Sequence, residues 1–366
     1  MVRWFSRTEP RPTALRHHQT SGGDSLPGDG APRPATSRPP TASQDVLAAM
    51  GRPAVLWAAW ARVAAGSGMP GADGLSVADF ARQLGIRLDR LADQLTAGAY
   101  EPQPLRLATI NRGGRRRALG LPTVRDRIAQ RAFLEVCHDQ LDAASVEVSF
   151  AYRRGRSWLD ALAEAERCRD TGRTTVLRTD VADYFACIRH DLLLAALPPG
   201  LAGEAATLID RWIAAPLLTE HGIIPRSKGI PEGAPLSPAL ANLHLRAFDT
   251  HVHHNPGNLV RYADDIAVFC VDVDGAIAAA HIVGRALADL DLEMNTTKTY
   301  ISSFDRGFSF LGWVFYRDGG WEAEPTAGWT HPMSVGRQRR TTQPDPAAYT
   351  GPQETFARTT AYRRAR

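Results

Sequence analysis

Two sets of aspartates interrupt apolar stretches of this chain where a folded protein would normally place hydrophobic residues. Asp180 ends the run T-V-L-R-T-D, and Asp264 and Asp265 lie between the segments N-L-V-R-Y-A and I-A-V-F-C-V. Burying such carboxylates together costs on the order of several kcal/mol unless a cation compensates. Magnesium suits the role because it prefers a few carboxylates together with phosphate oxygens. The alternative is an exposed Asp-Asp turn between two strands, since aspartate favours turns.

The spacing of apolar residues predicts helices that alternate with short strands. The expected helices span 45–65 (split at Pro53), 76–97 (capped by Ser76), 124–141, 158–169, 191–197, 203–213 and 276–290. On the helix at 124–141, we expect Arg125, Asp126, Arg127 and Arg131 on the polar face. The expected strands are a hairpin of 105–110 with 117–121, a strand at 176–181, two strands within 259–270, and one at 308–316. This pattern favours a mixed α+β or α/β fold and argues against an all-helical one.

Both ends of the chain differ from its body. Residues 1–44 are rich in Pro, Gly, Ser, Thr and Arg and show no apolar periodicity, so we predict a disordered basic tail. Residues 317–366 have a similar composition and are predicted to be irregular or disordered. The folded body between them is long enough for about two domains.

Charge and cysteine content restrict the class of protein. The net charge is +4 with a pI of about 9.0, and Lys228 and Lys298 are the only lysines, so arginine supplies almost all the positive charge. Arginine suits phosphate recognition, although a compositional bias of the genome explains the same pattern equally well. The four cysteines show no zinc-site spacing, which favours a reducing cytoplasmic setting. Asp272 and Asp274 interrupt the most apolar stretch, so no membrane span and no signal peptide are expected.

A series of short motifs then follows in a fixed order. They are G-A-D-G-L-S (71–76), Y-E-P-Q-P-L-R (100–106), R-R-A-L-G-L-P-T-V-R-D-R-I-A-Q (116–130), F-A-Y-R-R-G-R-S (150–157), D-V-A-D-Y-F-A-C-I (180–188), G-I-P-E-G-A-P-L-S-P-A-L-A-N (229–242), R-Y-A-D-D (261–265), N-T-T-K-T (295–299) and F-S-F-L-G-W (308–313). Between Trp60 and Trp313 the chain resembles the reverse transcriptase (RNA-directed DNA polymerase) family. The likeness is to the bacterial branch that is related to group II intron enzymes and includes CRISPR-associated members.

The resemblance implies an α+β right-hand polymerase with fingers and palm, an antiparallel palm sheet packed on helices, and a thumb that is reduced or absent. Residues 45–170 would form the N-terminal helices and fingers. Residues 171–316 would form the palm, which carries motifs A (180–188), B (229–242), C (261–265), D (295–299) and E (308–313).

The resemblance also implies a chemistry. Two Mg²⁺ ions, for which Mn²⁺ can substitute, would be held by Asp180, Asp264, Asp265 and the carbonyl of Val181. Lys298 would be the general acid for the leaving pyrophosphate; a surface lysine is the alternative. Asp183 has no such role and is expected to be solvated or structural.

Four more positions would contact the nucleotide. Phe185 stands where the family has an aromatic steric gate against the 2′-hydroxyl, with a core phenylalanine as the alternative. Arg112 and Arg117 of the fingers would meet the triphosphate. Gly233 would allow close backbone approach, and Glu232 replaces the glutamine that the family usually has in motif B.

The implied partners are an RNA template, a DNA or RNA primer, deoxynucleotides and a CRISPR-adaptation or phage-defence protein. Two other functions stay open from the sequence. One is a catalytically weak nucleic-acid-binding scaffold that acts with partner proteins, and the other is a template-independent or RNA-making polymerase on the same palm.

Overall fold

The computed structural model describes residues 44–66, 68–112, 115–255, 257–318 and 321–323. The tail predicted at 1–44 therefore lies outside the described residues except for Gln44, and so does most of the segment predicted to be irregular at 317–366. Among the helices that the structure describes, none has the length and apolar character needed to cross a membrane.

Four antiparallel strands form the sheet that carries the aspartates. Their order across the sheet is β6 (Asn258–Tyr262), β7 (Asp265–Cys270), β3 (Thr175–Asp180) and β8 (Tyr300–Ser303). Every residue of the central strand β3 is buried, as expected for a strand covered on both faces. The register places Asp180 directly opposite Asp265. The two predicted sets of aspartates thus lie at one end of one sheet.

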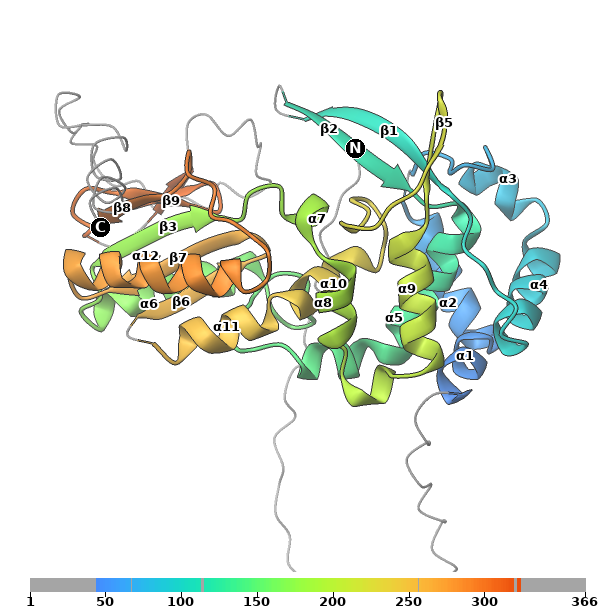
Figure 1. Cartoon of the computed structure of the whole chain (residues 1–366), viewed down its shortest axis with the longest axis horizontal. Helices are drawn as coiled ribbons and strands as arrows, with labels where there is room; N and C mark the ends of the chain where they lie inside the picture. The colour runs from blue at the N-terminus through green and yellow to red at the C-terminus, as the bar shows by residue number, and fades with distance from the viewer. Residues whose placement is uncertain (1–43, 67, 113–114, 256, 319–320, 324–366) are drawn as a thin grey trace, which may run out of the picture.

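Helices cover one face of this palm sheet. They are α12 (Val273–Ala288) and α11 (Arg246–His253), and Figure 1 shows α12 lying across the strands. Because side chains alternate along a strand, Leu177, Ile266 and Val268 point to this face. They belong to the larger hydrophobic cluster, which includes Val283 and Leu287 of α12.

The opposite face packs against α6 (Trp158–Asp170) and a small sheet of β9 (Phe308–Phe310), β10 (Trp313–Phe315) and β11 (Trp321–Ala323). Val176, Ala267 and Phe269 point to this side and join a second hydrophobic cluster with Phe308 and Phe315. The rings of Phe308 and Phe315 are stacked, with their centroids 5.2 Å apart. Aromatic packing therefore holds the small sheet against the strands that carry the aspartates.

The N-terminal half is largely helical. Its elements are α1 (Gln44–Met50), α2 (Pro53–Ala64), α3 (Val77–Ala81), α4 (Leu84–Thr96), α5 (Val124–Ala143) and, from later in the chain, α9 (Glu204–Ala214). The helix α5 lies at the centre and contacts both α1 and α2. The expectation that its polar residues form a solvated face was wrong for Asp126 and Arg127, which are buried. Tyr100 donates a 2.7 Å hydrogen bond to Asp126, which explains how that carboxylate is accommodated.

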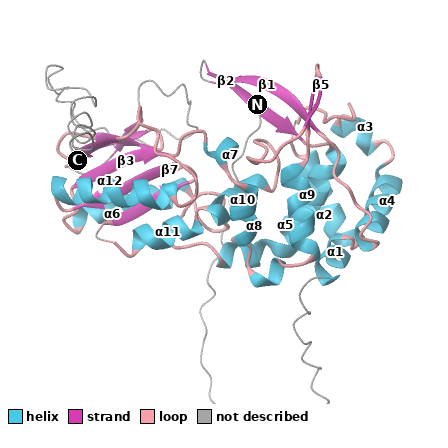
Figure 2. Ribbon diagram, in the orientation of Figure 1, coloured by secondary structure: helices cyan, strands magenta, loops and turns pink. Residues whose placement is uncertain are grey.

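A second four-stranded sheet projects from these helices. Figure 2 shows it as a group of strands separate from the palm sheet. Its order is β2 (Arg115–Leu121), β1 (Leu105–Arg112), β4 (Leu217–Thr219) and β5 (Gly222–Ile224), with β1 and β2 in the predicted hairpin. The strands β4 and β5 are too short to have been predicted and are inserted between motifs A and B. The α+β class and the fingers-and-palm architecture are confirmed.

Two predicted elements are divided in the structure. The helix expected at 76–97 is interrupted at Arg82 and Gln83, between α3 and α4. The strand expected at 308–316 is a hairpin, because Leu311 and Gly312 both have positive φ, at 55° and 79°. Short helices complete the described fold: α7 (Tyr184–Cys187), α8 (His190–Ala195), η1 (Pro199–Leu201) and α10 (Ser237–His244). The strand β11 lies within 317–366, where irregular structure was expected.

Candidate active site

Motifs A and C meet at the end of the palm sheet. Asp180 is the last residue of β3, and Asp264 lies in the tight turn between β6 and β7. The amide of Val181 donates to the carbonyl of Asp264 at 3.2 Å, which fixes one motif against the other. Ala263, just before Asp264, has φ of 60°, a left-handed conformation that costs about 1 kcal/mol in a residue with a Cβ. The chain therefore holds a strained turn in order to present Asp264.

Motif D is joined directly to motif A. The amide of Asn295 donates to the carbonyl of Asp180 at 2.8 Å, and the hydroxyls of Thr179 and Thr299 are 2.7 Å apart. Within the turn, the amide of Lys298 donates to the carbonyl of Asn295 at 3.0 Å. The turn thereby directs the Lys298 ammonium onto Oδ2 of Asp180. Two residues 118 positions apart in sequence are brought into direct contact.

The carboxylates at this end fit a divalent cation. The Oδ1 atom of Asp180 is buried without a hydrogen-bond partner among the described residues, so it is an acceptor that lacks a positive neighbour. Burial raises the pKa of Asp264, and the charges of Asp265 and Asp180 raise it further. A cation would relieve both effects. In the described ranges, however, no three His, Cys, Asp or Glu side chains are gathered as a ready metal-ligand group. The fit is thus to Asp180 and Asp264 with additional oxygens from elsewhere, which is usual for Mg²⁺.

Asp265 is bonded differently from the other two aspartates. One of its oxygens accepts a hydrogen bond of 2.6 Å from Nη2 of Arg178, a side chain of β3 that is only 9% exposed. Arg178 also donates to the carbonyl of Ser309 at 2.8 Å and lies over the ring of Phe310. The prediction that Asp265 binds metal stays a prediction.

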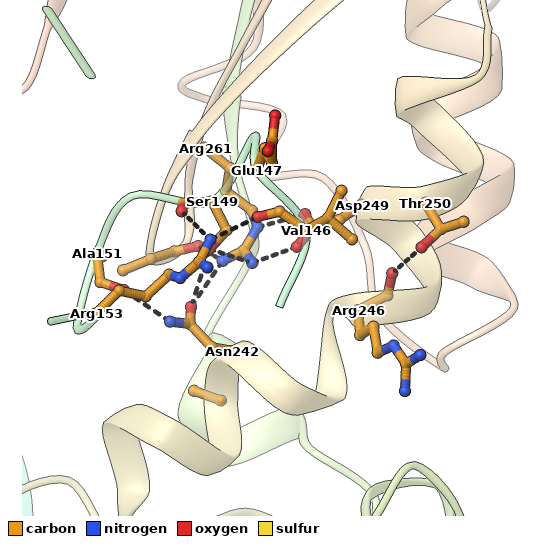
Figure 3. Close-up of polar contacts among 12 residues, drawn as sticks. Val146, Glu147, Ser149, Ala151, Arg153, Asn242, Arg246, Asp249, Thr250 and Arg261 are labelled. Atoms are coloured by element: carbon orange, nitrogen blue, oxygen red, sulfur yellow. Dashed lines mark hydrogen bonds and ion pairs between the residues drawn. The ribbon is translucent and has the colours of Figure 1, made fainter. Parts of the chain in front are cut away.

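A second buried arginine supports the turn of motif C (Figure 3). Arg261 is 1% exposed and donates to both oxygens of Asp249, at 2.6 and 2.5 Å. It also donates to the carbonyl of Ala263 at 2.8 Å, to Ser149 Oγ at 2.8 Å and to Asn242 Oδ1 at 3.1 Å. Burial raises the pKa of Asp249, and the Arg261 charge acts in the opposite direction. The residue that precedes Asp264 is therefore tied to motif B and to α11.

Motif B packs against the short helix of motif A. The amide of Ile230 donates to the carbonyl of Phe185 at 2.8 Å. Gly229 has φ of 80°, and a Cβ there would lie 2.8 Å from the carbonyl oxygen of Ala186. Only glycine fits this position without displacing the backbone that carries Phe185. The ring of Phe185 is half-buried and meets Tyr184 edge to face at 5.7 Å.

The other predicted substrate contacts are more dispersed. Gly233 is exposed with φ of 102°, and Glu232 is half-buried with no ion pair or hydrogen bond to another described residue. Arg117 is exposed on β2 opposite Ile110, and Arg112 ends β1. The exposed position of Asp183 agrees with the solvated role expected for it.

The sequence interpretation missed Arg178, Arg261 and Asp249. A signal was present, because an arginine within a run as apolar as T-V-L-R-T-D or N-L-V-R-Y must find a buried partner or leave the core. The partners themselves could not be found this way, since Asp249 lies on a helix and the carbonyl of Ser309 belongs to another sheet.

An antiparallel palm with acidic strand ends, a motif D lysine and a fingers hairpin defines a right-hand polymerase. The family model described as "Reverse transcriptase (RNA-dependent DNA polymerase)" matches residues 110–315, more than half of the chain. The chain belongs to this reverse transcriptase family.

Curated relatives agree. The chain is 27% identical over 288 residues to "Protein YkfC" of Escherichia coli (strain K12), which covers 68% of this chain and 76% of the relative. It is 27% identical over 169 residues to "Group II intron-encoded protein LtrA" of Lactococcus lactis subsp. cremoris, which covers 45% of this chain and only 28% of the relative.

Solved structures with a similar arrangement also exist. A chain of the "Partial Cas6-RT-Cas1--Cas2 complex" matches with a TM-score of 0.43 and 25% identity over 67% of this chain and 41% of that chain. A chain of the telomerase of Candida albicans matches with a TM-score of 0.49 and 11% identity over 69% of this chain and 50% of that chain.

Proposed function

We propose that this chain is an active reverse transcriptase that extends a primer with deoxynucleotides by a two-metal mechanism. The observation that carries the proposal is the meeting of Asp180, Asp264 and Lys298 at one end of the palm sheet, with one buried oxygen of Asp180 unpartnered. We propose Asp180, Asp264 and the carbonyl of Val181 as metal ligands, with Asp265 beside them. Bound Mg²⁺ would supply activation of the primer 3′ oxygen and neutralisation of charge on the triphosphate.

Lys298 is proposed to protonate the leaving pyrophosphate. Its ammonium is half-exposed, and its contact with Asp180 keeps it at the metal end of the sheet. A lysine held there by a hydrogen-bonded turn needs no large rearrangement to meet a phosphate oxygen, and such preorganisation is what electrostatic catalysis requires.

The nucleotide is proposed to bind between motif A and the fingers. Phe185 would lie under the sugar and exclude a 2′-hydroxyl, since its backbone is fixed by Ile230 and Gly229. Arg117 and Arg112 of the β1–β2 hairpin would contact the triphosphate through charge-assisted hydrogen bonds. Glu232 and Gly233 would line the nucleotide and template side.

The proposed nucleic-acid substrates are an RNA template and a DNA or RNA primer. The chain spans less than a third of the intron-encoded relative, so the activities of that whole protein are not transferred to it. A CRISPR-adaptation or defence partner stays a prediction.

Primer extension tests this proposal. The purified protein is given an RNA template, an annealed DNA primer, Mg²⁺ and deoxynucleotides, beside an Asp264→Ala variant. We expect extension by the parent and none by the variant. Equal extension by both would refute the proposed metal site.

Absence of extension from the parent, on RNA and DNA templates alike, would favour the scaffold alternative. Glu232→Gln restores the residue usual in motif B and provides the decisive comparison in that case. Extension by Glu232→Gln alone would show that the palm is intact and that Glu232 limits nucleotide use.

A further inference from the structure

We propose that Asp265 is not a metal ligand, and that Arg178 and Asp265 form an ion pair that ties β9 to the catalytic strands and leaves Asp180 and Asp264 as the ligands. The inference rests on the proposed function and changes the ligand set assigned to it. It makes Arg178 a positioning residue of the site.

The sheet register brings the pair together. Asp180 and Asp265 are partners across β3 and β7, and Arg178 is the partner of Ala267. Because side chains two residues apart on a strand share a face, Arg178 lies on the same face as Asp180, and Asp265 on the same face as Ala267. The guanidinium therefore reaches Asp265 diagonally across the two strands, at 2.6 Å.

Arg178 is fixed by more than this one bond. Its Nε donates to the carbonyl of Ser309 at 2.8 Å, and its Nη1 donates to the carbonyl of Ile266. The guanidinium carbon lies 4.6 Å from the centre of the Phe310 ring, which is fully buried. A planar cation with three acceptors and an aromatic surface has little freedom to release Asp265.

The aspartates differ in what they lack. Asp180 has a buried oxygen without a partner, whereas Asp265 already has a cation at one oxygen. The absence of a three-residue ligand group in the described part of the chain agrees with an Asp265 that is directed elsewhere. Two carboxylates and a carbonyl are sufficient for Mg²⁺ when phosphate oxygens complete its coordination.

The pair also joins two sheets. The carbonyl of Ser309 and the ring of Phe310 belong to β9, while Asp265 begins β7. Arg178 thus sets the position of the β9–β10 hairpin relative to Asp180 and Asp264.

The test compares Asp264→Asn with Asp265→Asn, two neighbouring changes of the same size. Manganese binding to the full chain is followed by electron paramagnetic resonance, with a primer–template ended by a dideoxynucleotide and with the matching deoxynucleotide present. We expect Asp264→Asn to weaken Mn²⁺ binding by about tenfold or more, as loss of an interaction to the metal typically does, and Asp265→Asn to change it by less than about threefold. Equal weakening by the two variants would overturn the proposal.

A second measurement needs no metal. The melting temperature is measured for Arg178→Met, Asp265→Asn and the double variant in the presence of a chelator. We expect each single change to lower it by several degrees, and the double variant to lose clearly less than the two losses added together. Additive losses would overturn the ion pair. If Asp264→Asn leaves Mn²⁺ binding unchanged, the proposed metal site fails, while the Arg178–Asp265 coupling is still decided by the chelated samples.

Discussion

Arg261 is among the largest fully buried side chains of the protein, and its change to methionine leaves Asp249 as a buried charge without its counter-ion. Removal of one member of a buried ion pair typically costs about 3–5 kcal/mol of unfolding free energy. Asp249→Leu removes the other member and should cost a similar amount, because the guanidinium would then be the unpaired charge.

The double change should cost much less than the two single changes added together. It removes both charges and fills their space with apolar atoms, a replacement that is often close to neutral. What remains is the loss of the Arg261 hydrogen bonds to Ser149, Asn242 and Ala263, at about 1 kcal/mol each. We therefore expect the double variant to lose about 3 kcal/mol, against about 6–10 for the sum of the single losses.

Urea denaturation of the parent and the three variants measures this coupling. The exposed pair of Arg189 and Asp191 is the matched control, since it also forms two hydrogen bonds but in contact with water. Its coupling should be too small to measure. Losses at Arg261 and Asp249 that add to within about 0.5 kcal/mol would refute the reasoning.

Three further outcomes follow from the structure. Burial lowers the pKa of His244 to about 4 from 6.5, so between these values the folded protein binds fewer protons than the unfolded chain. The stability from the neutral ring is therefore complete above pH 6.5 and declines by about 3 kcal/mol as the pH falls to 4; His244→Leu should flatten this profile in urea titrations at several pH values, and an unchanged slope would contradict the assignment. Gly229→Ala should lose about 1–3 kcal/mol more in urea denaturation than Gly98→Ala, because both glycines have positive φ but only at Gly229 would the new Cβ meet backbone; equal losses would exclude the clash. Phe185→Val should raise incorporation of ribonucleotides relative to deoxynucleotides by about tenfold or more in single-nucleotide assays, and an unchanged ratio would show that Phe185 is a core residue and not a gate.

Much of the palm could be predicted because its strands carry local signals. The apolar runs that end in Asp180 and surround Asp264 and Asp265 are short, β-branched and bounded by acidic residues, so the strands appeared as expected. Pro53 divided the first helical segment as its missing amide hydrogen requires. These features depend on a few neighbouring residues.

The parts that could not be predicted depend on contacts between distant segments. The buried face of Asp126 follows from Tyr100 on a preceding loop. The bonding of Asp265 follows from Arg178, 87 residues earlier in the chain. The hairpin at Leu311 is set by a backbone conformation that apolar periodicity does not reveal. Sequence therefore indicated which residues gather at the site, but not how each carboxylate is neutralised there.

The addition of one deoxynucleotide to a DNA primer on an RNA template is the most direct test that this palm is catalytic. Asp180→Asn is compared with Asp183→Asn, which makes the same change three residues away at an exposed position where asparagine tolerates the φ of 41°. The account predicts that Asp180→Asn slows incorporation by at least about 10³-fold while Asp183→Asn stays close to the parent. Equal rates for Asp180→Asn and the parent would contradict it.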